Sequence, residues 1–149
     1  MVAIACDHAA VSLKNAVVEF LKGKGYEVQD FGAFEGEKAD YPDKALLVAE
    51  AVASKKADKG IVICGTGIGI SIAANKVKGI RCALCSDTFS AHATREHNDA
   101  NMLAFGERVV GMGLAIDIVN TFMSTEFSGE ERHQRRIDKI SAIEENYFK

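Results

Sequence analysis

The sequence predicts an α/β fold in which a five-stranded parallel sheet lies between two layers of helices. Short apolar runs alternate along the chain with longer segments that carry apolar residues at helical spacing. Strands that alternate with helices in this way pair in parallel, with helices on both faces of the sheet. In addition, the run from Ile61 to Cys64 is followed by Gly65, Gly67 and Gly69 and an alanine-rich segment. A strand, a glycine loop and a helix start in this order typically build an anion site.

The first half of the chain is predicted to contain three strands, at residues 2–6, 26–30 and 60–64. Apolar residues at helical spacing predict a helix over residues 9–24, which ends at Gly25. A loop with glycines and charges follows the second strand. Pro42 suits the first turn of a helix, so a second helix is predicted over residues 40–54.

The second half begins with the glycine loop and a helix that ends near residue 76. Two further strands are predicted, at residues 80–85 and 102–105. Ser86 or Asp87 can cap a helix over residues 86–95. The last two helices are predicted over residues 113–125 and 130–147, with a break at Ser128 and Gly129.

The composition is that of an ordinary globular protein. With 149 residues, 48% hydrophobic and 26% charged, the chain is expected to form one domain over residues 1–149. A net charge of −3 argues against nucleic acid as a partner. No apolar run is long enough to cross a membrane, and the chain does not start like a signal peptide. The cytoplasm is therefore the expected location.

The four cysteines are expected to be free thiols in a reducing compartment. Cys82 and Cys85 have the C-x-x-C spacing of redox and zinc sites. They fall within a predicted strand, where residues three apart point to opposite faces. We therefore expect them to be core or strand-end residues, and no metal site is predicted.

Polar residues follow several predicted strands at their carboxyl ends, where parallel sheets bind ligands. Asp7 and His8 follow the first strand, although Asp7 can also cap the first helix. Cys64 ends the third strand. A helix start beside it would stabilise a thiolate that acts as a nucleophile or general base. A buried strand-end thiol without a function is an equally good interpretation of its position.

The glycine loop itself has two interpretations. Gly65, Gly67 and Gly69 would let backbone N–H groups approach an anion, or they form a tight turn without a ligand. Asp87 follows the next strand, where a ribose-binding acid is expected in nucleotide-binding proteins. A non-catalytic nucleotide-binding module is therefore a rival hypothesis, although the glycine spacing departs from the dinucleotide fingerprint.

Two candidate groups lie later in the chain. His97 begins a polar segment and can transfer protons near neutral pH, unless that segment is an ordinary loop. Arg132 and Arg136 are about one helical turn apart, so they can clamp a phosphate together. Because acidic residues surround them, a solvated helix face is the alternative.

Together these residues form motifs that resemble those of the type B ribose-5-phosphate isomerases, a group that includes allose- and galactose-6-phosphate isomerases. The resemblance spans the chain and rests on Cys6-Asp7-His8, Asp40-Tyr41-Pro42, Cys64-Gly65-Thr66-Gly67 to Ser71, Ala73-Ala74-Asn75-Lys76, His97-Asn98-Asp99-Ala100-Asn101, Ala104-Phe105-Gly106-Glu107-Arg108, and Arg132 with Arg136. The cysteine–glycine loop joined to Ala-Ala-Asn-Lys is highly specific.

The resemblance implies a three-layer Rossmann-like fold whose C-terminal helix extends to a partner subunit. It also implies a homodimer, or a dimer of dimers, with active sites at the subunit interface. The implied reaction interconverts D-ribose 5-phosphate and D-ribulose 5-phosphate through an enediolate, as in pentose phosphate metabolism. No metal or organic cofactor is implied. Six-carbon aldose 6-phosphates are rival substrates within the same class.

The resemblance also implies residue roles. Cys64 is the base that removes the C2 proton, because the glutamate base of a second form of the family corresponds to Ile70 here. The developing oxyanion is stabilised by Thr66 and by the backbone N–H groups of Gly65, Gly67, Ile68 and Gly69. His97 assists ring opening, and Asp7 and Asn98 orient sugar hydroxyls. The phosphate is held by His8, Arg108, Arg132 and Arg136.

Overall fold

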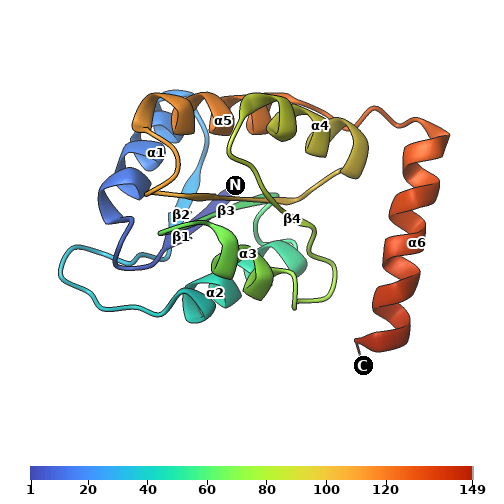
Figure 1. The fold of residues 1–149 in the computed structure, drawn as a ribbon, viewed down its shortest axis with the longest axis horizontal. Helices are drawn as coiled ribbons and strands as arrows, with labels where there is room; N and C mark the ends of the chain where they lie inside the picture. The colour runs from blue at the N-terminus through green and yellow to red at the C-terminus, as the bar shows by residue number, and fades with distance from the viewer. Residues whose placement is uncertain (149) are drawn as a thin grey trace.

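The computed structural model describes residues 1–148 and contains a five-stranded parallel sheet with strand order β2-β1-β3-β5-β4 (Figure 1). The strands are β1 (Val2–Cys6), β2 (Val28–Asp30), β3 (Lys59–Cys64), β4 (Cys82–Leu84) and β5 (Met102–Gly106). The helices are α1 (Val11–Gly23), α2 (Tyr41–Ala53), α3 (Ile68–Ala74), α4 (Thr88–Asn98), α5 (Met112–Ser124) and α6 (Glu131–Tyr147). The α/β class and the parallel sheet predicted from the sequence are confirmed.

The helices form two layers around the sheet. Helices α1, α4 and α5 cover one face, and α2 and α3 cover the other (Figure 1). The three central strands β1, β3 and β5 pair along their length, with Cys6 opposite Ile63 and Cys64 opposite Gly106. Their carboxyl ends therefore meet at one edge, as expected for parallel strands.

The two faces of the sheet carry side chains of different size. Ile4, Ile63 and Phe105 belong to the core under α1, α4 and α5. Ala5 and Ala104 belong to the core under α2 and α3, together with Cys64. Small side chains on this second face let the helices lie close to the strands. Cys64 is thus on the face that α3 covers, directly before the loop that leads into this helix.

The edge strands are shorter than the sequence predicts. The strand predicted at 80–85 is confined to Cys82–Leu84. Asn101 Oδ1 accepts the Arg81 N–H at 2.8 Å, so that backbone group is bound before the strand begins. Asn75 both accepts the Cys82 N–H (2.8 Å) and donates to the Cys82 carbonyl (2.9 Å). This side chain occupies the edge where a further strand would pair. Likewise, β2 starts at Val28 rather than at residue 26.

Helix α4 extends further than the sequence predicts. Asp87 caps its start by accepting the Ser90 N–H, as predicted for a cap. The predicted helix ends at Arg95, but the buried Arg95 guanidinium donates to Asp99 at 2.8 Å and so stabilises one more turn. Asp99 then ends the helix in the left-handed conformation. His97 therefore lies in the last helical turn, so the predicted helix end at Arg95 was wrong, and the alternative of an ordinary loop does not apply to His97.

Helix α6 stands beside the rest of the molecule (Figure 1). It is held by two buried side chains, His133 and Ile137. Ile140 and Ile143 further along the helix are exposed. Of the helices within residues 1–148, none combines the length and the apolar character needed to cross a membrane.

Candidate active site

A cavity of about 440 Å³ opens at the carboxyl edge of the central strands. It is lined by Asp7, His8, Ala9, Tyr41, Cys64, Gly65, Thr66, Ile68, Gly69 and Arg108. These residues come from the ends of β1, β3 and β5 and from the starts of α2 and α3. The cavity is large enough for a small-molecule ligand. Eight of the residues predicted to form the site are therefore brought together here.

Cys64 lies at the base of this cavity. The thiol is almost fully buried, with 4% of the residue exposed. The Gly67 N–H donates to Cys64 Sγ at 3.1 Å. A thiolate accepts such a bond more strongly than a neutral thiol does. Ile70 stands where the resemblance places the alternative glutamate base. It is fully buried, and its hydrocarbon side chain cannot transfer a proton.

The loop after Cys64 follows its path because two glycines permit close backbone contact. Gly67 has φ +81°, and a Cβ there would lie 2.6 Å from the Phe105 backbone and 2.6 Å from the Leu84 side chain. A Cβ at Gly106 would lie 2.4 Å from the Thr66 backbone. The loop is therefore pressed onto the end of β5. Gly67 is buried beneath this loop and does not itself line the cavity.

Arg108 is tied to the same loop. The Glu107 N–H donates to the Cys64 carbonyl and the Arg108 N–H donates to the Gly65 carbonyl, both at 2.9 Å. The Arg108 guanidinium lies against Gly65, 3.7 Å from the position that a Cβ would take. Its charge therefore faces the cavity from the side of β5.

Asp7 and His8 form the opposite wall. Asp7 Oδ1 accepts the Ala9 N–H at 3.0 Å, so the predicted capping contact at the start of the first helix exists alongside its place in the cavity. His8 Nδ1 donates to the Ala39 carbonyl at 3.0 Å. Because a carbonyl only accepts, this bond places a proton on Nδ1 and leaves Nε2 for another partner.

Tyr41 was not predicted as a site residue. Its ring reaches the cavity from the first residue of α2. A Cβ at Gly69 would lie 2.6 Å from this ring, so the missing side chain at Gly69 leaves the space that the ring takes. The sequence shows this residue only as part of Asp40-Tyr41-Pro42, a helix start.

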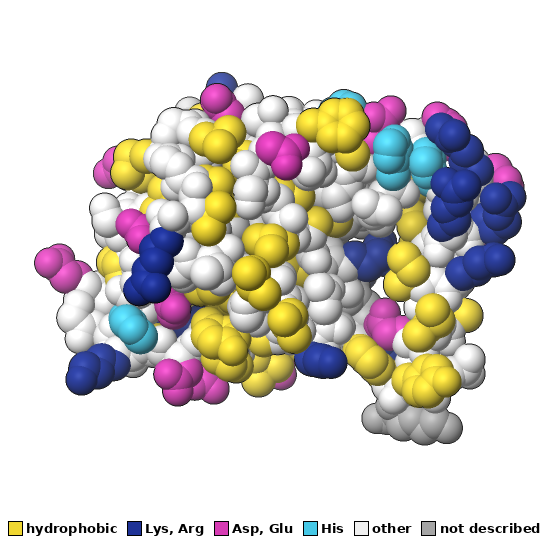
Figure 2. All heavy atoms as spheres, viewed as in Figure 1, with side chains coloured by type: hydrophobic (Ala, Val, Ile, Leu, Met, Phe, Trp, Pro, Cys, Tyr) yellow, Lys and Arg dark blue, Asp and Glu magenta, His cyan; other side chains and the backbone are white. Residues whose placement is uncertain are grey.

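The other predicted site residues lie in a second polar cluster, made by the end of α4 and the start of α6. His97 and Asn98 are in the last turn of α4, and Arg132 and Arg136 are on α6. Figure 2 shows His, Lys and Arg side chains gathered at this end of α6. Arg132 Nε donates to Glu130 at 2.8 Å, as the solvated-face interpretation expects.

The two clusters lie at opposite edges of the sheet. The Gly60 N–H, near the start of β3, donates to the Asn101 carbonyl just after α4, whereas Cys64 ends that strand. Four residue steps along β3 of about 3.3 Å each put these edges about 13 Å apart. The chain therefore does not bring His97 to its own Cys64.

His133 packs between the two helices of the second cluster. Its ring stacks on His97 with centroids 4.4 Å apart and an interplanar angle of 15°. The residue is 6% exposed, and its Nε2 is buried without a hydrogen-bond partner in the described part of the chain, residues 1–148. Burial lowers the pKa of His133 from its usual value, and the neighbouring His97, Arg132 and Arg136 lower it further.

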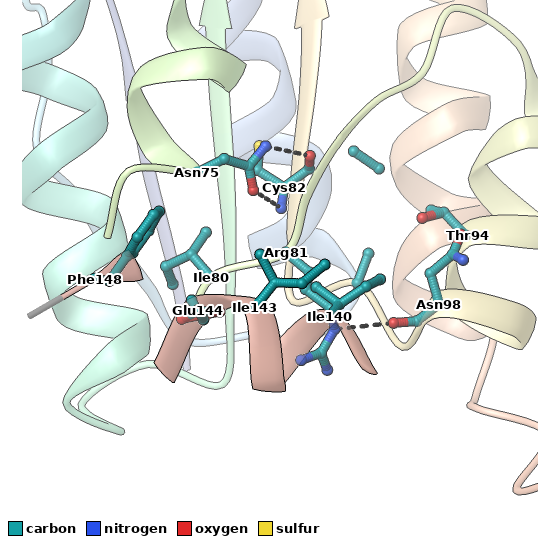
Figure 3. Close-up of a pocket in the computed structure, with 12 residues that line it drawn as sticks. Asn75, Ile80, Arg81, Cys82, Thr94, Asn98, Ile140, Ile143, Glu144 and Phe148 are labelled. Carbon is teal, nitrogen blue, oxygen red and sulfur yellow. Dashed lines mark hydrogen bonds between the residues drawn. The ribbon is translucent and has the colours of Figure 1, made fainter. Parts of the chain in front are cut away.

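A groove of about 460 Å³ lies between α6 and β4 (Figure 3). Its polar groups are already paired: Asn75 bonds to Cys82, and Arg81 Nε donates to the Asn98 carbonyl. Ile80, Ile140 and Ile143 supply much of the remaining lining. The groove therefore offers an apolar surface and not a set of converging reactive groups.

Two rival interpretations lose support. Both Asp87 carboxylate oxygens bind Ser90, at 2.6 and 2.9 Å, so Asp87 acts as a helix cap. Burial raises the pKa of Cys82 to about 12 and that of Cys85 to about 11, which makes both thiols poor nucleophiles. All four cysteines are free thiols. Within residues 1–148, no three His, Cys, Asp or Glu side chains converge as metal ligands would.

Comparison with known proteins gives consistent matches over nearly the whole chain. Residues 2–140 match the sequence model of the ribose/galactose isomerase family. Ribose-5-phosphate isomerase B of Escherichia coli is 50% identical over 144 residues, which cover 97% of this chain and 96% of that protein.

Solved structures agree with these sequence matches. Ribose-5-phosphate isomerase B of Clostridium thermocellum superposes with a TM-score of 0.95 at 57% identity, covering 98% of each chain. The Mycoplasma genitalium enzyme, solved with bound ribulose-5-phosphate, gives a TM-score of 0.91 at 44% identity, covering 97% of this chain and 95% of that one.

Proposed function

Because the chain belongs to the ribose/galactose isomerase family, we propose that it interconverts D-ribose 5-phosphate and D-ribulose 5-phosphate. It is an aldose–ketose isomerase. The observation that carries the choice of chemistry is the cavity in which the Cys64 thiol, the glycine loop and the Arg108 cation face one another. Its four free thiols suit the cytoplasm, and pentose phosphate metabolism is the proposed context.

The reaction moves a proton from C2 to C1 of the open sugar through an enediolate, while O2 loses a proton and O1 gains one. In our proposal the Cys64 thiolate removes the C2 proton and returns it to C1. The oxyanion that develops meanwhile needs hydrogen-bond donors at fixed positions. Thr66 and the backbone N–H groups of Gly65 and Gly69, which line the cavity, serve this purpose in our proposal, and Asp7 orients the sugar hydroxyls. The Gly67 N–H instead donates to Cys64 Sγ, and the Ile68 N–H donates to Thr66 Oγ1 at 3.2 Å. Support comes from the buried sulfur and from the loop that surrounds it.

The substrate phosphate is assigned to His8 and Arg108, which lie in the cavity, and to Arg132 and Arg136. The two α6 arginines, like His97 and Asn98, belong to the opposite edge of the protomer. We therefore propose a homodimer in which each subunit contributes its second cluster to its partner's cavity. An exchange of this kind is reciprocal under two-fold symmetry, so it forms two equal sites.

An apolar surface beside the cavity supports such a dimer. Hydrophobic side chains gather over α3 and its surroundings (Figure 2). The exposed members of this surface, between 39% and 56% accessible, are Tyr41, Ile68, Ile72, Leu84 and Val109. Exposed apolar surface that adjoins a binding site is typical of a subunit interface.

The direct test is conversion of ribose 5-phosphate to ribulose 5-phosphate by the purified protein in the presence of a chelator. Turnover that persists with chelator fits the metal-free reaction, whereas loss of turnover would contradict it. Cys64→Ala is expected to lower kcat at least about 100-fold, because it removes the proposed base. Cys82→Ala is the matched control and retains turnover. Normal turnover by Cys64→Ala would remove Cys64 as the base.

A mixing experiment tests the shared site. Cys64→Ala and His97→Ala are each expected to be impaired. If the subunits share sites, a heterodimer of the two variants contains one wild-type site and one doubly altered site. An equal, exchanged mixture then recovers about a quarter of the wild-type activity, because half of the dimers are mixed. No recovery after subunit exchange would contradict the shared site.

Six-carbon aldose 6-phosphates are the second candidate substrates, since the matching family includes galactose isomerases. Turnover of ribose 5-phosphate is compared with that of allose 6-phosphate and galactose 6-phosphate under the same conditions. A higher kcat/KM for either hexose phosphate would replace the pentose assignment and leave the isomerase chemistry unchanged.

A further inference from the structure

We infer that His133 is a positioning residue for His97: its ring stacks on the His97 imidazole and holds it in the orientation that sugar ring opening requires. This inference rests on the proposed function, in which His97 assists ring opening. His133 lies on α6 between Arg132 and Arg136 in sequence, and it has no role among the predicted site residues.

The geometry restricts the His97 ring. The centroids are 4.4 Å apart and the planes are tilted by only 15°, so one face of His97 is covered by His133. His133 is itself 6% exposed and fixed between α4 and α6. A side chain whose rotation is limited by a packed neighbour keeps its reactive atoms at a defined place.

Among residues 1–148, the buried Nε2 of His133 has no hydrogen-bond partner, so this atom does not fix the ring. The contact that His133 makes with His97 is the stacking of the two flat rings. Burial and the nearby His97, Arg132 and Arg136 lower the pKa of His133, whereas Glu130 raises it. These effects favour the neutral form of the His133 ring.

Ring opening is the step that depends on this orientation. The proton on O1 of the cyclic sugar leaves, the C1–O4 bond breaks, and O4 gains a proton. An imidazole that passes the proton from O1 to O4 has to reach both oxygens in turn. Ribulose 5-phosphate needs no such step, because its O5 carries the phosphate and it has no furanose form. Exchange of its C1 hydrogen with solvent requires the base alone.

The test separates these two steps. His133→Leu is expected to lower kcat for ribose 5-phosphate about tenfold with KM within about twofold of wild type. Deuterium exchange at C1 of ribulose 5-phosphate in D₂O, followed by proton NMR, is expected to stay within about twofold of wild type. His133→Phe restores a flat ring and is expected to recover kcat to within about threefold. His92→Leu, a matched change of an exposed histidine on α4, leaves both rates unchanged.

Three results would overturn the inference. The first is normal ribose 5-phosphate turnover by His133→Leu. The second is an equal loss of turnover and exchange, which indicates a general structural defect. The third is failure of His133→Phe to recover turnover. If His133→Leu does not fold, His133→Asn, which also lacks the ring, gives the same comparison. The wild-type protein is measured first. If it does not convert ribose 5-phosphate, the proposed function is refuted, and this result is separate from the three that overturn the inference.

Discussion

Cys64 differs from the other cysteines in its surroundings. Burial raises the pKa of Cys6 to about 11, and Cys82 and Cys85 are affected in the same direction. Cys64 is also buried, but it lines a cavity and accepts a backbone N–H from Gly67. The same side chain is thus an inert core residue at three positions and a candidate base at the fourth.

Gly67 is expected to tolerate no side chain. Its φ of +81° is costly for other residues, and a Cβ would lie 2.6 Å from the Phe105 backbone. Gly79 has φ +88° but no heavy atom within 4 Å of the added Cβ. Gly79→Ala is therefore expected to cost about 1 kcal/mol of unfolding free energy, and Gly67→Ala at least about 2 kcal/mol more. Urea denaturation measures both, and equal costs would show that close contact plays no part.

The residues of the cavity were predictable to different degrees. Asp7 directly follows a strand and Cys64 ends one, so the strand pattern alone indicates that they share one edge, whereas Arg108 was predicted only from the family resemblance. Tyr41 was not predicted to line the cavity, and His133 was not predicted to belong to the second cluster. Tyr41 reaches the cavity because Gly69 lacks a side chain, and His133 meets His97 because α6 crosses α4. Such contacts depend on how elements pack, which no local pattern shows.

At the scale of elements, α1 is joined to β2 by a buried ion pair. Lys14 is fully buried, and its Nζ donates to both Asp30 oxygens, at 2.7 and 3.0 Å. Asp30 is partly exposed and also accepts the Gly32 N–H at 2.8 Å. The lysine has this carboxylate as its ion-pair partner and also lies over the Phe34 ring, 4.5 Å from the centroid, whereas the carboxylate accepts a further hydrogen bond and reaches water. This ion pair therefore holds the short strand β2 against α1.

This asymmetry predicts unequal effects of removing either partner. Asp30→Ala leaves a buried ammonium unpaired and is expected to cost about 3–5 kcal/mol of unfolding free energy. Lys14→Met keeps an apolar stem of similar length and leaves a carboxylate that reaches water, so about 1 kcal/mol is expected. Denaturant titration of both variants gives the comparison. A larger loss for Lys14→Met would contradict the burial argument.

The order and type of the elements followed from hydrophobic periodicity, but their ends did not. The edge strand β4 is short because Asn75 and Asn101 bind backbone groups beside it. Helix α4 is long because Arg95 pairs with Asp99 across its final turn. In both cases a side chain from one segment binds the backbone or charge of another. Helical and strand propensities contain no information about such partners.

For the whole molecule, the main consequence is the separation of the two polar clusters. The sequence predicts both His97 and Cys64 as site residues but does not give the distance between them. Their positions follow from the direction of the elements: Cys64 ends a strand, whereas His97 ends a helix that runs back across the sheet. The two clusters therefore lie at opposite edges of the sheet, and the proposed dimer would bring the second cluster of one subunit to the cavity of the other.

The dimer is expected to depend on the apolar surface beside the cavity. Ile72→Lys places a charge on a side chain that is 56% exposed on α3 and outside the cavity lining. We expect the variant to sediment as a monomer and to lose at least about tenfold in specific activity, with an unchanged circular dichroism spectrum. Leu114→Lys, on α5 across the sheet, is the control that retains both. A fully active monomer of Ile72→Lys would contradict the shared site.

Two backbone hydrogen bonds join the segment after β5 to the loop after β3 and fix the spacing between these two segments. Because Glu107 and Arg108 donate to the carbonyls of Cys64 and Gly65, the proposed base and the proposed phosphate anchor cannot drift apart. In the proposed mechanism, the gap between them would set how many carbons fit between the reacting C2 and the phosphate. A hexose 6-phosphate, one carbon longer, would then have to bend to meet both ends, so the proposed site is expected to favour the shorter chain.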